Sequence, residues 1–190
     1  INGNWKTTRP FEKIVSDTKP VVLLYNKPKG VVCSTAEKDN IVDYIGFSER
    51  IYPVGRLDRE SEGLLLMTND GAFANEIIHP SHHVAKTYRV TVHPRISEEQ
   101  LTALTKGVLV DGRLSSPAGI KVLAQERERT VLEIILEEGR NRQIRKMCEA
   151  VGLEVARLKR TAIGPIKLGM LQPGKYRELT PQEMKALANA

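Results

Sequence analysis

The apolar residues of this chain are grouped in short runs of strand length, and this grouping limits what the chain can fold into. Residues 21–25 are continuously apolar, residues 63–68 form a second apolar run, and residues 87–92 alternate and are rich in β-branched side chains. Short runs of this kind are typical of strands. Further strands are expected at residues 31–33, 120–123, 130–136 and 153–160. No run approaches the roughly 18 apolar residues of a membrane helix, so we expect no membrane partner.

Helix signals lie among these runs but do not alternate with them regularly. Asp70 is expected to cap a helix over residues 73–78, capping boxes stand at residues 97–100 and 180–183, and a short helix is expected at residues 41–45. Residues 144, 147, 148 and 151 form the apolar stripe of a further helix over residues 141–150. Asp111-Gly112 is a hairpin signal. This irregular order predicts an α+β fold around a mixed sheet.

The positive charge of the chain is concentrated in one segment. The formal net charge is +6, and residues 139–160 contain seven basic residues against two acidic ones. A basic patch of this kind favours a polyanion, and the common cytosolic polyanion is nucleic acid. The alternative is a solvated helix face without a ligand.

Cofactor and metal motifs are missing from the sequence. It has no phosphate-binding loop, no dinucleotide fingerprint and no paired cysteine motif, so we expect neither a cofactor nor a metal. Four histidines at residues 79, 82, 83 and 93 lack a supporting set of carboxylates and are expected at the surface. Two distant cysteines, Cys33 and Cys148, indicate free thiols in a reducing cytoplasm. The chain shows no secretory leader, and its start at Ile1 without Met suggests that an amino-terminal part was cut away.

The densest polar stretch is the glycine-flanked segment 55–63, between two apolar runs. It contains three acids, Asp58, Glu60 and Glu62. If the stretch were extended, these carboxylates would share one face, and a carboxylate pair can catalyse hydrolysis. The alternative is a solvated loop in which Arg56 and Arg59 neutralise the acids.

Four segments in order resemble motifs of the RNA pseudouridine synthases. They are Gly-Arg-Leu-Asp at 55–58 with the Ser61-x-Gly63 that follows, the strand and turn at 24–30, Lys-Thr-Tyr at 86–88, and the basic helix segment at 138–147; residues 177–180 add to the likeness. More narrowly, the chain resembles the large-subunit enzymes of the branch that modifies bacterial ribosomal RNA and carries an amino-terminal S4 domain. The resemblance implies a pseudouridine synthase fold, in which helices flank a central, largely antiparallel mixed sheet with an active-site cleft. It also implies that residues 1–20 follow a missing S4 domain and that residues 21–190 form the catalytic domain.

The resemblance assigns roles within the cleft. Asp58 matches the family's nucleophilic aspartate, and attack on the ribose or on the base both remain open. A buried carboxylate needs a guanidinium to stay ionised, and Arg145 is the expected partner, with Arg142 as the alternative. Tyr88 is expected to stack on the uracil and to move the C5 proton, and Arg56 to fill the space that the extracted base leaves.

A second set of residues is expected to hold the RNA backbone while the target uridine leaves its stack. This set comprises Arg56, Arg140, Arg142, Lys146, Arg157, Lys159 and Arg160. The expected protein is a cytoplasmic monomer that uses neither cofactor nor metal and acts on ribosomal RNA of the large subunit. The alternatives are small-subunit ribosomal RNA as substrate and a catalytically silent RNA-binding module in ribosome assembly.

Overall fold

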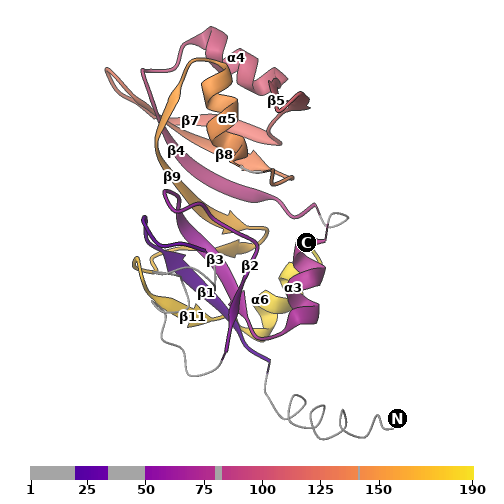
Figure 1. Ribbon diagram of the computed structural model, residues 1–190. Coiled ribbons are helices and arrows are strands. Elements are labelled where there is room, and N and C mark those ends of the chain that lie inside the picture. The colour runs from indigo at the N-terminus through magenta and orange to yellow at the C-terminus, as the bar shows by residue number, and fades with distance from the viewer. Residues whose placement is uncertain (1–19, 34–49, 80–82, 141) are drawn as a thin grey trace, which may run out of the picture.

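One large sheet organises the part of the chain that the computed structural model describes, residues 20–33, 50–79, 83–140 and 142–190 (Figure 1). The elements are β1 (Val22–Lys27), β2 (Tyr52–Val54), β3 (Glu62–Thr68), α3 (Gly71–Ile78), β4 (Lys86–His93), α4 (Glu98–Lys106), β5 (Val108–Val110), β6 (Arg113–Ser115), β7 (Gly119–Gln125), β8 (Thr130–Leu136), α5 (Gln143–Ala150), β9 (Glu154–Ile163), β10 (Ile166–Lys167), β11 (Tyr176–Glu178) and α6 (Pro181–Ala188). None of the described helices is long and apolar enough to span a bilayer.

The sheet has the strand order β11-β1-β3-β9-β4-β8-β7, with β2 paired to β3 and β10 paired to β9. These neighbours run antiparallel, apart from β3 and β9, which are parallel. The α+β fold with a mixed, largely antiparallel sheet, predicted from the sequence, is therefore confirmed.

The sheet is shared by two halves of the molecule, each with its own core (Figure 1). In one half, α4 and α5 pack against β4 and β8 through residues such as Leu104, Met147 and Leu132. In the other half, β1 and β3 are buried on both faces, and α3 and α6 pack on one of them. Strand β9 contributes Leu158 to the first core and Ile163 to the second, so this strand joins the two halves.

The junction between the halves is a short parallel pairing in which Gly63 of β3 lies opposite Arg160 of β9. The backbones approach so closely there that a Cβ on residue 63 would collide with the Arg160 carbonyl oxygen. Gly63 also has a φ of 109°, a conformation that side chains rarely adopt. Only glycine fits this position without a shift of the backbone.

The predicted caps and turns are present where the structure describes them. The backbone amides of Ala72 and Phe73 donate to Asp70, and both capping boxes close, at the starts of α4 and α6. Asp111 and Gly112, both with positive φ, turn the β5–β6 hairpin. Strands β2, β10 and β11 were not predicted, because two or three residues carry too little pattern. The helix expected at residues 41–45 and the leading segment, apart from residue 20, lie outside the described residues.

We expect Gly63→Ala to lower the free energy of unfolding by about 2–5 kcal/mol, because the new methyl group adds both a backbone clash and an unfavourable φ. Urea unfolding measures this loss. Gly119→Ala is the matched control, since its Cβ would meet Ile135 at an ordinary contact distance of 3.4 Å. Equal stability of the two variants would contradict the close approach of the β3 and β9 backbones at Gly63.

Candidate active site

A cavity of about 530 Å³ is lined by residues from both halves of the molecule. The loop at residues 55–58 and Ser61 line it from one half, and residues 136–140 and the start of α5 line it from the other. Strands β4 and β9 also contribute to its wall. The three residues expected to be catalytic, Asp58, Tyr88 and Arg145, all line this one cavity.

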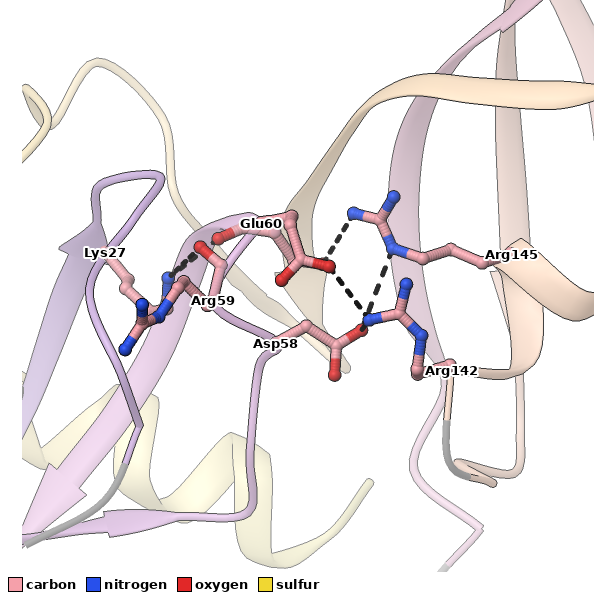
Figure 2. A network of polar contacts seen from close by, with 7 residues as sticks. Lys27, Asp58, Arg59, Glu60, Arg142 and Arg145 are labelled. Carbon is pink, nitrogen blue, oxygen red and sulfur yellow. Dashed lines mark hydrogen bonds and ion pairs between the residues drawn. The ribbon is translucent and has the colours of Figure 1, made fainter. Parts of the chain in front are cut away.

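A buried lysine, Lys27, holds the loop that carries Asp58. Lys27 is completely buried at the end of β1, and its Nζ donates to the carbonyl oxygens of Pro28 (2.9 Å), Arg59 (3.4 Å) and Ser61 (2.8 Å). Figure 2 shows Lys27 reaching the backbone of Arg59. Burial lowers the pKa of Lys27 to about 8. Burying the Lys27 side chain is unfavourable, and its hydrogen bonds hold two carbonyls of the Asp58 loop and one of the turn after β1 in place.

Two guanidinium groups from the other half face the Asp58 carboxylate (Figure 2). Arg142 Nη1 lies 3.3 Å from Asp58 Oδ2, and Arg145 Nε lies 3.7 Å from the same oxygen. The Arg145 side chain is only 12% exposed, against 39% for Arg142. Both arginines considered from the sequence therefore contact Asp58, and Arg145 is the more deeply placed of the two.

Arg142 also contacts a second acid. Its Nη1 donates to Glu60 at 3.0 Å, and this hydrogen bond lowers the pKa of the Glu60 carboxyl group. Arg142 itself has a φ of 53°, an uncommon left-handed conformation for a residue with a side chain. Asp58 and Glu60 therefore converge on one arginine nitrogen.

The start of α5 is held by side chains that sequence reasoning did not single out. Gln143 is buried and donates to Ser115 (2.5 Å) and to Glu138 (2.6 Å), while Arg145 Nη2 donates to Ser61 Oγ at 3.1 Å. The last bond joins α5 directly to the loop of Asp58. Gln143, Ser61 and Lys27 all lie inside the motifs recognised in the sequence, and this position was the one sequence signal for their importance. Their roles could not be read from it, because they depend on contacts between distant segments.

Tyr88 is 8% exposed and lies directly opposite Arg160 in the pairing of β4 with β9. Both residues line the cavity. The ring of Tyr88 is part of the core formed with β8 and α5, which fixes its position. A flat, rigid aromatic ring in a cavity wall is a suitable surface for a planar ligand.

The residues expected to bind the RNA backbone do not form one surface. Arg56, Arg140, Arg142 and Arg160 line the cavity, whereas Arg157 and Lys159 line a second concavity with Arg89 and Thr91. Because successive side chains of a strand point to opposite faces, β9 directs Arg160 to one side of the sheet and Arg157 and Lys159 to the other.

Several of these basic residues also have partners within the protein. Arg157 forms two hydrogen bonds of 2.9 Å with Glu62, and Lys146 contacts Asp111 at 2.7 Å. Arg160 is 4% exposed and donates to the Leu64 carbonyl oxygen. Arg160 therefore lies in the buried wall of the cavity, apart from Arg157 and Lys159, with which the sequence analysis grouped it.

The expectations about the other acids and histidines are also changed by the fold. Glu62 is bound to Arg157 and does not line the cavity, so the three acids of segment 55–63 do not share one face. Arg56 pairs with neither Glu60 nor Glu62, which contact Arg142 and Arg157 instead. His79 and His83 are exposed and line the cavity. Among the described residues, no three histidines, cysteines or acids lie together as a metal site would require.

The sequence of this chain matches a known protein family. The family model described as RNA pseudouridylate synthase matches residues 21–150. Ribosomal large subunit pseudouridine synthase B of Bacillus subtilis is 40% identical over 91% of this chain and 73% of its own length. Dual-specificity RNA pseudouridine synthase RluF of Escherichia coli is 40% identical over 97% of this chain and 61% of its own length. Each relative thus has sequence beyond the matched part.

A solved structure agrees with these sequence matches. The crystal structure of a pseudouridylate synthase superposes with a TM-score of 0.81 at 32% identity, over 89% of this chain and 74% of that protein. The shared fold extends over both halves of the molecule, since such coverage exceeds either half alone.

The contacts of Lys27 predict a local effect on the loop. In Lys27→Met, we expect the amides of Gly30 and Ser61, which donate to Arg59 and Asp58, to exchange about 10- to 100-fold faster, because the loop carbonyls lose their donor. Hydrogen exchange measures this change. Lys29→Met, at the exposed neighbouring lysine, is the control and should leave both amides unchanged. Unchanged exchange in Lys27→Met would show that the lysine does not hold the loop.

Proposed function

Since this chain belongs to the RNA pseudouridylate synthase family, we propose that it converts uridine to pseudouridine in ribosomal RNA. The observation that carries the proposal is the meeting of Asp58, Arg145 and Tyr88 in one cavity. A carboxylate and an aromatic ring that line one cavity can serve this isomerisation as nucleophile and as stacking surface. The names of the relatives support ribosomal RNA, and that of the first supports the large subunit.

The reaction rearranges bonds within one nucleotide. The bond from C1′ to N1 of uracil breaks, a bond from C1′ to C5 forms, and the proton of C5 is replaced by one on N1, so no oxidant and no co-substrate is consumed. Asp58 acts as the nucleophile, and attack on the ribose or on the base both require its ionised form. Arg145 and Arg142 stabilise that form at 3.7 and 3.3 Å.

Tyr88 and the cavity wall complete the proposed mechanism. The uracil stacks on the Tyr88 ring after the nucleotide has left its helix, which costs a few kcal/mol and is easiest in loops. In the proposed mechanism, the Tyr88 hydroxyl moves the C5 proton. Arg56 is exposed at the cavity, and Glu60 and Glu62 contact other arginines. This supports the proposal that Arg56 fills the space that the target base leaves in the RNA stack.

Backbone contacts to the RNA are proposed for two regions. Arg56, Arg140, Arg142 and Lys146 lie at or next to the cavity, and Arg157 and Lys159 extend the basic surface to the other face of the sheet. We propose a monomer as the active form. A ribosomal RNA substrate supports a cytoplasmic location.

Asp58→Asn separates this enzyme from a silent RNA-binding module. We expect the variant to fold and bind RNA, because the change is nearly isosteric, but to form no detectable pseudouridine, because an amide is a poor nucleophile. The assay is tritium release from ribosomal RNA transcribed with 5-tritiated uridine. Glu60→Gln, which alters the neighbouring acid, should keep most of the activity. Wild-type release by Asp58→Asn would remove the nucleophile assignment.

We expect Arg145→Ala to affect stability and turnover, and Arg142→Ala to affect mainly RNA binding. Loss of the more buried Arg145 should lower the unfolding free energy by about 1–3 kcal/mol and reduce the single-turnover rate, because Asp58 loses a charged partner. Loss of the more exposed Arg142 should mainly weaken binding and reduce the log–log salt slope by about 0.7–0.9, the value for one phosphate contact. Thermal unfolding, single-turnover kinetics and salt titrations compare the two. If Arg145→Ala changed only the salt slope, the two roles would have to be exchanged.

A further inference from the structure

Of the cationic side chains in the cavity wall that are not exposed to solvent, two have no acidic partner among the described residues. They are Lys86, at the start of β4, and Arg160, on β9. Among the described residues, no carboxylate lies within ion-pair distance of either one. Two acids of the cavity are paired with other cations. Asp58 contacts Arg142 and Arg145, and Glu138 contacts Arg140.

Arg160 has an unused donor. Its side chain is 96% buried, since only 4% is exposed, and its Nε donates to the Leu64 carbonyl oxygen at 2.8 Å. Its Nη2 is buried and has no hydrogen-bond partner within the described part of the chain. Buried polar groups are almost always paired in folded proteins, so an unpaired guanidinium nitrogen in a cavity wall points to a ligand.

Lys86 adds a second donor beside the first. It is half-buried, and within the described ranges no hydrogen bond or ion pair to its Nζ is found. Burial and the charge of Arg160 lower the pKa of Lys86, which shows that the two cations are close enough to repel each other. A hydrogen-bond acceptor between the two groups would relieve this repulsion.

The position of Lys86 and Arg160 relative to Tyr88 indicates which part of a ligand they would contact. Tyr88 and Arg160 are directly opposite in neighbouring strands, and Lys86 lies two residues before Tyr88 on the same face of β4. Side chains opposite each other in a sheet have Cβ atoms about 5 Å apart. A base that stacks on the Tyr88 ring therefore has its edge next to both cations.

We propose that Lys86 and Arg160 donate to the C4 carbonyl oxygen of the target uracil and thereby select uracil over cytosine. This inference rests on the proposed function and specifies how the same cavity recognises its base. Cytosine has an amino group at position 4, so it would place a donor against two donors. A site built to bind an acceptor rejects a base that lacks it, because its own buried groups then remain unpaired.

Binding of free nucleotides tests this recognition without the need for turnover. Three probes are titrated into the full chain by NMR: uridine 5′-monophosphate, cytidine 5′-monophosphate, and the monophosphate of pyrimidin-2-one riboside, which has only hydrogen at position 4. All three carry the same ribose phosphate, so contacts to that part cancel in the ratios. The wild-type chain should bind the uridine probe about 10- to 100-fold more tightly than the pyrimidin-2-one probe, the value of a charge-assisted hydrogen bond.

Lys86→Met should reduce this preference about tenfold while leaving the melting temperature near that of the wild type. Lys121→Met is the matched control, because it removes a lysine of β7 that does not line the cavity and contacts Glu133 at 3.8 Å. It should keep the full preference. Arg160→Gln, which retains an amide donor, should lower the preference less than Lys86→Met does.

Three results would overturn the inference: no binding of the uridine probe, equal binding of all three probes by the wild type, or an unchanged preference in Lys86→Met. Failure of the proposed function appears separately, as absence of tritium release. A chain that prefers the uridine probe but releases no tritium would support base recognition and refute catalysis.

Discussion

The close approach of β3 and β9 at Gly63 is the contact on which the rest of the structure depends. Together with β9, which contributes to both cores, it joins the two halves through a parallel pairing of only two residue pairs. The loop of Asp58 leads directly into β3, and Tyr88 lies across β9 from that junction. The cavity exists because the two halves are held at this distance, so one missing side chain at residue 63 controls the geometry of the site.

The electrostatics of the site are prepared by the fold before any ligand arrives. Lys27 is buried under the Asp58 loop, Arg145 is bonded to that loop through Ser61, and Gln143 fixes the start of α5. Each of these groups is costly to bury, and each forms at least one hydrogen bond that offsets part of this cost. The Asp58 carboxylate therefore already has two guanidinium neighbours in the folded protein.

Charge along the sequence is a poor guide to charge on a surface in this protein. The basic residues of segment 139–160 are divided between the cavity, the far face of the sheet and the interior, because a strand directs alternate side chains to opposite faces. Arg157 is bound to Glu62, whereas Arg160 is buried with a donor unused. Of the three basic residues of β9, Arg157 and Lys159 share the second concavity, and only Arg160 lines the pocket that contains Asp58.

The sequence by itself determined the α+β class, the caps at Asp70, Ser97 and Thr180, and the identity of Asp58, Tyr88 and Arg145 as the residues to examine. These features depend on local periodicity, on hydrogen bonds within one turn, or on motifs that can be read in order. Only the tertiary structure decided that Arg142 and Arg145 both contact Asp58, that Lys27 holds its loop, and that Lys86 and Arg160 lack acidic partners. The contact between Arg142 and Asp58, for example, joins residues 84 positions apart, and the energy of such a contact depends on burial, which no local pattern records.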